Sequence, residues 1–156
     1  MKAENIIVFS YDDVATDSQN PFPGKLFNKP TTGAGVDVNK GCKIDYKGDD
    51  VTPTNYINVI TGEADKMKSI GTGRVLKSTS EDHVFIYFAD HGGSGLIAFP
   101  NEYLYTNDFQ ASLKTMHTKK MYKQLVYYME ACESGSMWLK FPDNLNIYAL
   151  SAANST

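Results

Sequence analysis

A cysteine and a histidine, Cys132 and His91, are the residues of this chain best suited to covalent chemistry. The thiolate is the reactive form of cysteine, whereas a free thiol with a pKa of about 8.5 is mostly protonated at neutral pH. A histidine nearby can activate the thiol and later protonate a leaving amine. Gly92 and Gly93 follow the histidine, so a substrate carbonyl could approach the backbone there. Their amides, together with the amide of Cys132, could form an oxyanion hole.

Both reactive residues follow segments whose composition predicts a buried strand. Residues 83–89 are mostly β-branched and aromatic, and residues 125–129 form a second apolar run. Residues 106–117 lie between them and carry apolar side chains at helical spacing. A helical crossover makes the two strands parallel, so their carboxyl ends lie at one edge of the sheet. The sequence therefore predicts that His91 and Cys132 end neighbouring strands, at the edge where ligands bind in open α/β sheets.

Other interpretations of the same residues remain open at this point. His91 could be a loop residue with no task, and a lone cysteine such as Cys132 is often a small buried hydrophobe. A metal site built from Asp90, His91, Glu130 and Cys132 lacks the paired C-x-x-C or H-x-x-x-H spacing that places two ligands on one element. Catalysis is favoured because both residues stand at strand ends with glycine close behind.

The remaining segments predict how these strands are supported. Residues 6–9 form an apolar run typical of a strand buried on both faces, and residues 145–150 form another. A helix is expected from Thr52, which can cap it, with Pro53 in its first turn and Gly62 near its end. Alternating strands and helices indicate an α/β fold with a mostly parallel sheet covered on both sides.

Residues 11–50 are expected to form a long loop, because prolines and glycines interrupt any regular element there. The interruptions are Asn20-Pro21-Phe22-Pro23-Gly24, Lys29-Pro30 and Gly33-Ala34-Gly35. Cys42 lies in this loop and is interpreted as an incidental free thiol. The acidic pairs Asp12-Asp13 and Asp49-Asp50 look like metal carboxylates, but capping and solvating the loop is the favoured interpretation.

Composition excludes several classes of protein. The chain has 156 residues, which corresponds to one domain over 1–156, and its 42% hydrophobic and 12% aromatic content excludes a disordered tail. Its 15 basic and 18 acidic residues contain no basic block, so nucleic acid is not an expected partner. No apolar run approaches the roughly 20 residues of a membrane helix, and no membrane partner is expected. The first residues lack a secretory signal, which by itself predicts a cytosolic protein.

Several segments resemble the legumain family, the asparaginyl endopeptidases that include plant vacuolar processing enzymes. The most specific is Glu130-Ala131-Cys132-Glu133-Ser134-Gly135-Ser136-Met137, and Asp90-His91-Gly92 is another. The resemblance covers almost the whole chain. Further matching segments are Tyr11–Asp13, Asn20–Gly24, Asp45–Pro53, Asp82–Phe88, Asn146–Ala149 and Ala152–Asn154.

The resemblance implies a three-layer α/β/α caspase-like fold with a mostly parallel central sheet. It also implies cysteine endopeptidase activity after asparagine, and more slowly after aspartate. By similarity, Cys132 is the nucleophile, His91 the general acid/base and Gly92 an oxyanion donor. Glu130 would line the asparagine pocket, since an asparagine side chain offers two amide donors. Asp90 matches an auxiliary aspartate that can cyclise to a succinimide, and the alternative is a loop carboxylate that caps backbone amides.

The family pattern extends beyond this chain in both directions, so the fold is expected to be incomplete at both ends. A truncated, catalytically inactive fragment is therefore one alternative, and a transamidase or ligase that uses the same acyl-enzyme is another. No cofactor is indicated, because a thiol–imidazole pair needs none. The implied partners are protein and peptide substrates with asparagine at the cleavage site, and a prodomain or a cystatin-type inhibitor. The resemblance moves the expected location to an endolysosomal or vacuolar compartment, or to secretion.

Overall fold

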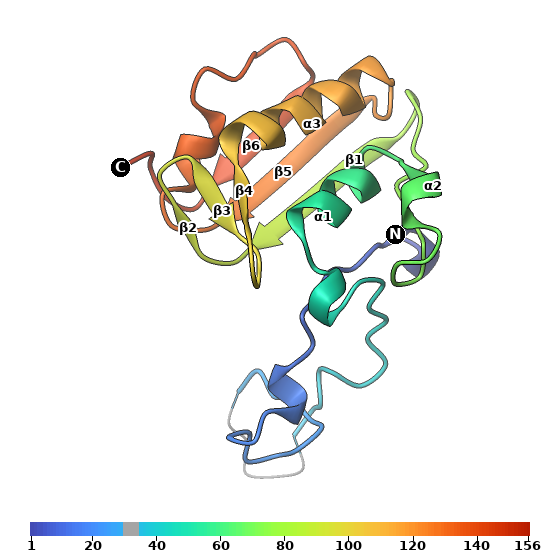
Figure 1. Cartoon of the computed structure of the whole chain (residues 1–156), viewed down its shortest axis with the longest axis vertical. Coiled ribbons are helices and arrows are strands. Elements are labelled where there is room, and N and C mark those ends of the chain that lie inside the picture. Colours follow the sequence, from blue (N-terminus) through green and yellow to red (C-terminus); the bar gives the residue numbers. More distant parts are fainter. Residues whose placement is uncertain (30–34) are drawn as a thin grey trace.

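The computed structural model describes residues 1–29 and 35–156, and its centre is a parallel sheet of three strands (Figure 1). The strand order is β1-β5-β6, and both neighbouring pairs are parallel. Two of the predicted strands are confirmed nearly to the residue, and the third begins at Ile147 instead of Leu145. The strands are β1 (His83–Ala89), β5 (Gln124–Glu130) and β6 (Ile147–Ser151).

A small antiparallel sheet follows β1, and the sequence did not predict it. Its strands, in the order β2-β3-β4, are β2 (Gly92–Gly93), β3 (Leu96–Ala98) and β4 (Tyr103–Tyr105). Each has only two or three residues, too few to show the alternation of apolar and polar side chains by which a strand is recognised. Because this sheet begins at Gly92, it holds the backbone beside His91 in a regular, hydrogen-bonded conformation.

Two of the helices match the predicted ones. Helix α1 (Pro53–Ile60) is capped by Thr52, whose hydroxyl accepts a hydrogen bond from the Asn55 amide at 3.1 Å. Gly62 follows it with a φ of +76°, a conformation that glycine adopts readily. Helix α3 (Thr106–Thr118) spans the predicted range 106–117 and ends one residue beyond it. A short helix α2 (Ala64–Met67) was not predicted.

The main hydrophobic core lies between the sheet and the helices α1 and α3, which cover the same face (Figure 1). Alternate residues of β1 and β5 face this core, as their burial pattern shows. The buried hydroxyls of Tyr56 and Tyr127 lie 2.7 Å apart and satisfy each other across it. The core includes Tyr56, Ile60, Val84, Phe109, Leu113, Met116, Leu125, Tyr127 and Met129.

The opposite face of the sheet is exposed and apolar. Its large side chains are Phe85, Tyr87, Tyr128, Tyr148 and Leu150. No helix among the described residues covers this face. The described residues therefore form two layers of the expected α/β/α arrangement, the sheet and one layer of helices. This architecture agrees with an incomplete caspase-like α/β fold. None of the described helices is long and apolar enough to cross a membrane.

The predicted strand at residues 6–9 is wrong. Ala3–Asn5 form a turn of 3₁₀ helix, and Phe9 alone makes an isolated parallel bridge, to Tyr46. The Val8 amide donates to the carboxylate of Asp45 at 2.9 Å, and the amides of Asp45 and Tyr46 donate to the Val8 carbonyl. A side chain thus takes a hydrogen bond that a neighbouring strand would have taken. An apolar run alone does not reveal such a partner.

The long loop is confirmed over the part of residues 11–50 that the structure describes. It contains only two 3₁₀ turns, Val14–Thr16 and Gly48–Asp50. The Asn20 side-chain amide closes one turn by donating to the carbonyls of Val14, Ala15 and Lys25. The predicted breaks at Pro30, Gly33 and Ala34 lie outside the described residues. Figure 1 shows the rest of this segment extending away from the sheet.

Candidate active site

The two predicted reactive residues follow neighbouring parallel strands, as expected. The last residues of β1 and β5, Ala89 and Glu130, are paired in register. Beyond them the Asp90 amide donates to the Glu130 carbonyl at 3.2 Å, which carries the backbone pairing one step further. His91 follows Asp90 directly, Cys132 lies two residues beyond Glu130, and both are exposed.

Gly92 packs directly against the backbone of Cys132, and this contact brings the two segments together. A methyl group on Gly92 would overlap the Cys132 carbonyl oxygen and lie 3.0 Å from the Ala131 Cβ. Only glycine therefore fits without a shift of the backbone. The His91 carbonyl accepts from the Ala98 amide at 2.9 Å, which ties the histidine segment to β3.

Cys132 lies at a tight turn between β5 and the 3₁₀ helix Ser134–Trp138. Glu133 adopts a left-handed conformation with a φ of +51°, which is uncommon for a residue other than glycine. The Ser134 amide returns to the Ala131 carbonyl at 3.3 Å. The chain therefore changes direction directly after Cys132, and the cysteine is exposed to solvent, where a substrate could reach its thiol.

Two buried serines anchor this turn, and the sequence did not assign them a role. The Ser134 hydroxyl accepts from the Ala153 amide at 3.3 Å, which ties the turn to the chain beyond β6. The Ser136 hydroxyl accepts from the Gly95 amide at 2.9 Å and so ties the turn to the β2–β3 hairpin. In the sequence, the only indication of this anchoring role was that Ser134 and Ser136 are small residues within the segment Glu130–Met137.

Glu130 lies on the exposed face of the sheet, two residues before the cysteine. Its carboxylate accepts a hydrogen bond from the Tyr87 hydroxyl, with 2.6 Å between the oxygens. This hydrogen bond raises the pKa of Tyr87, because the carboxylate stabilises the neutral phenol. The sequence analysis did not single out Tyr87 as a site residue. The two-residue period of β1, combined with its register against β5, could have found it.

The carboxylate of Asp90 accepts from the His91 backbone amide at 2.7 Å. This is the contact that the capping interpretation of Asp90 predicts. Its effect is local: the hydrogen bond restrains the backbone that leads into the histidine.

The described residues contain no group of three or more His, Cys, Asp or Glu side chains placed to hold a metal ion. Cys42 is exposed and lies 3.2 Å from the Val38 carbonyl, with both cysteines in the free form.

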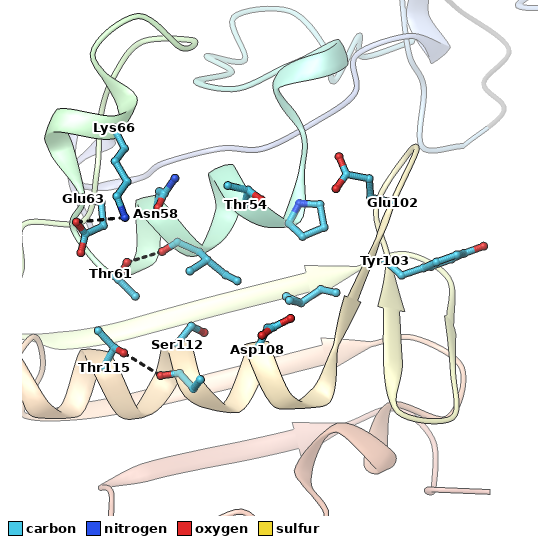
Figure 2. Close-up of a pocket in the computed structure, with 14 residues that line it drawn as sticks. Thr54, Asn58, Thr61, Glu63, Lys66, Glu102, Tyr103, Asp108, Ser112 and Thr115 are labelled. Carbon is cyan, nitrogen blue, oxygen red and sulfur yellow. Dashed lines mark hydrogen bonds and ion pairs between the residues drawn. The ribbon is translucent and has the colours of Figure 1, made fainter.

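A groove of about 540 Å³ lies on the helical face of the molecule, between α1 and α3 (Figure 2). Glu102, Tyr103 and Asp108 line one end of it, and the ion pair of Glu63 and Lys66, at 3.8 Å, lines the other. None of the predicted site residues lines this groove, and Glu130 lies on the opposite face of the sheet. The groove is thus separate from the candidate site.

Fold and site together define an α/β protein with a cysteine and a histidine at the carboxyl ends of adjacent parallel strands. The profile of the Peptidase C13 family matches residues 1–156, and the chain belongs to this family. It is 50% identical to legumain from Homo sapiens over 151 residues, which cover 97% of this chain and 34% of that protein.

Relatives from other kingdoms and phyla show similar identity. Hemoglobinase from Schistosoma mansoni is 50% identical over 157 residues, covering 100% of this chain and 35% of that protein. Vacuolar-processing enzyme from Phaseolus vulgaris is 46% identical over 157 residues, covering 99% of this chain and 31% of that protein. The chain thus spans about a third of the length of the curated relatives it matches.

Proposed function

We propose that the protein carrying this chain is a cysteine endopeptidase, with Cys132 as its nucleophile and His91 as its general acid/base. The packing of Gly92 on the Cys132 backbone carries the proposal, because it brings the histidine segment and the cysteine turn together. Membership in a peptidase family supports it independently.

The chemistry follows from these groups in order. His91 takes the thiol proton, and the Cys132 sulfur attacks the carbonyl carbon of the scissile peptide bond. The backbone amide of Gly92, with that of Cys132, donates to the oxyanion that develops. His91 then protonates the departing amine, leaving an acyl-enzyme that water hydrolyses. No cofactor takes part in any of these steps.

Glu130 is proposed to select asparagine at the cleavage site. A carboxylate is an acceptor, and the asparagine side chain presents two amide donors. An aspartate side chain would bring a second negative charge close to Glu130 unless it is protonated. Cleavage after aspartate is therefore expected to be slower. The proposed partners are protein and peptide substrates, and a prodomain or a cystatin-type inhibitor.

An endolysosomal or vacuolar compartment is the proposed location. The name of the vacuolar-processing enzyme from Phaseolus vulgaris supports this, since it is 46% identical to the chain. An acidic compartment would also protonate part of the aspartate side chains of substrates and so extend the range of cleavage sites.

The test uses the complete protein that carries this chain and peptides that differ only in one residue, asparagine, aspartate or alanine. Cys132→Ala and His91→Ala should each lower cleavage after asparagine at least about 10³-fold, as removal of a catalytic pair does. Cys42→Ser is the matched control, because it removes the other free, exposed thiol.

Mass spectrometry of the products, with and without an added amine, separates hydrolysis from transfer to an amine. Transfer as the main product would favour a ligase. Cleavage by the complete protein but not by residues 1–156 expressed alone would favour the interpretation of this chain as an inactive fragment. Unchanged cleavage by Cys132→Ala would refute the proposal.

A further inference from the structure

The hydrogen bond between Tyr87 and Glu130 joins two strands that are far apart in sequence. The phenol oxygen lies 2.6 Å from the carboxylate oxygen, a short distance typical of a hydrogen bond to a charged acceptor. Tyr87 belongs to β1, whereas Glu130 is the last residue of β5.

The sheet register shows why these two side chains meet. Tyr87 pairs with Tyr128, and Ala89 pairs with Glu130, so Tyr87 is the diagonal neighbour of Glu130 on the exposed face. Diagonal neighbours are within reach of long aromatic side chains. Ala89, directly beside Glu130, carries only a methyl group and cannot compete for the carboxylate as a hydrogen-bond donor. Both partners stand on a hydrogen-bonded ladder, which positions groups more precisely than a loop.

We propose that Tyr87 is a positioning residue that orients the Glu130 carboxylate toward the asparagine side chain of the substrate. The proposal rests on the proposed function, in which Glu130 recognises that side chain. A free glutamate samples several rotamers, and selecting one on binding costs affinity. The Tyr87 hydroxyl removes part of this cost in advance.

The chemistry of the pair leaves Glu130 competent to bind. An ionised carboxylate has about four lone-pair sites, and the phenol occupies one of them. The remaining sites can accept from both hydrogens of a substrate amide. Since the hydrogen bond also raises the pKa of Tyr87, the phenol remains a donor throughout the acidic and neutral range.

The experiment compares Tyr87→Phe with wild type in the complete protein, using a peptide with asparagine at the cleavage site. We expect KM to rise about five- to tenfold while kcat stays within about twofold, because the lost hydroxyl affects the side-chain pocket and not the scissile bond. Tyr128→Phe is the matched control. It removes a hydroxyl from the paired position on the same face, and its KM should equal that of the wild type.

Two further measurements separate positioning from a structural role. Tyr87→Phe should have no additional effect on a Glu130→Gln background, since the group it orients is then changed. Alkylation of Cys132 by iodoacetamide, which does not use the pocket, should proceed at the wild-type rate in Tyr87→Phe.

The outcomes distinguish failure of this inference from failure of the proposed function. An unchanged KM in Tyr87→Phe, when Glu130→Gln raises the KM for the asparagine peptide but leaves cleavage measurable, would overturn the inference alone. A parallel loss of kcat and of iodoacetamide reactivity would also overturn it, by showing a structural role. No cleavage after asparagine by the wild type would overturn both.

Discussion

Replacing Gly92 with alanine tests whether the closeness of the histidine and cysteine segments is needed for function. The added methyl group would overlap the Cys132 carbonyl oxygen and lie 3.0 Å from the Ala131 Cβ. Both obstacles belong to the cysteine turn, and one is backbone, which cannot rotate away. The two segments must therefore separate to accept the methyl group.

The size of the effect follows from this overlap. Overpacking of a closely packed contact costs about 1–3 kcal/mol in stability. A displacement of about 1 Å at a reacting centre can lower the rate about 100-fold. We therefore expect kcat/KM for an asparagine peptide to fall at least about 100-fold in Gly92→Ala, with a smaller effect on folding.

The assay combines peptide cleavage with urea denaturation, and Gly93→Ala is the control. A methyl group on Gly93 would meet only the Leu96 side chain, at 3.6 Å and beyond, which is ordinary contact. This variant should retain activity within a few-fold and should unfold at nearly the same urea concentration. The two variants differ by one position and make the same chemical change.

Wild-type activity in Gly92→Ala, with an unchanged urea midpoint, would refute the reasoning. It would mean that the close packing of Gly92 on Cys132 does not exist in the protein. Equal losses in both glycine variants would point to flexibility of the β2 strand as the cause, and not to the contact with the cysteine turn.

Three further predictions concern stability, each measured by urea denaturation. Tyr56→Phe leaves the buried Tyr127 hydroxyl without its partner and should cost about 1–3 kcal/mol; an unchanged midpoint would contradict the pairing. Asp45→Asn removes the negative charge of a carboxylate that pairs with the half-exposed Arg74 and accepts a hydrogen bond from the Val8 amide. It should cost about 1–3 kcal/mol, less than for a fully buried pair, and high salt should reduce the difference from wild type only slightly. A hydrogen bond from Lys119 lowers the pKa of Glu63, so the folded state favours the ionised carboxylate. This stabilisation is present above about pH 4.5, the ordinary pKa of the side chain, and is lost as the pH falls through the folded value. Lys119 also donates to the Thr61 carbonyl at 3.0 Å, a hydrogen bond that is lost at any pH. Lys119→Met should therefore destabilise the protein more at pH 7 than at pH 3, and a pH-independent difference would contradict the assignment.

The parallel strands and the helices that carry the core could be predicted from sequence because their signals are local. Residues 83–89 and 125–129 are long apolar runs. Thr52 caps the start of helix α1, and Gly62 adopts a left-handed conformation just beyond its end. Such preferences act within a few neighbouring residues, so they can be read without knowing the tertiary structure.

The strand predicted at residues 6–9 failed for the opposite reason. The hydrogen-bond partner of Val8 is the side chain of Asp45, which is held in turn by Thr72 and Arg74. The residues around Val8 contain no pattern that predicts a hydrogen bond to a side chain so distant in sequence. The short strands β2, β3 and β4 were missed because their pairing, and not their composition, makes them strands.

The sequence by itself therefore determined which residues could react and which edge of the sheet would carry them. His91 and Cys132 follow two recognisable strands, and parallel strands share a carboxyl edge. Only the tertiary structure decided how closely those ends approach, through the contact of Gly92 with Cys132, and which side chain reaches Glu130. The physical reason is that strand formation depends on neighbours in sequence, whereas register and packing depend on residues that folding alone brings together.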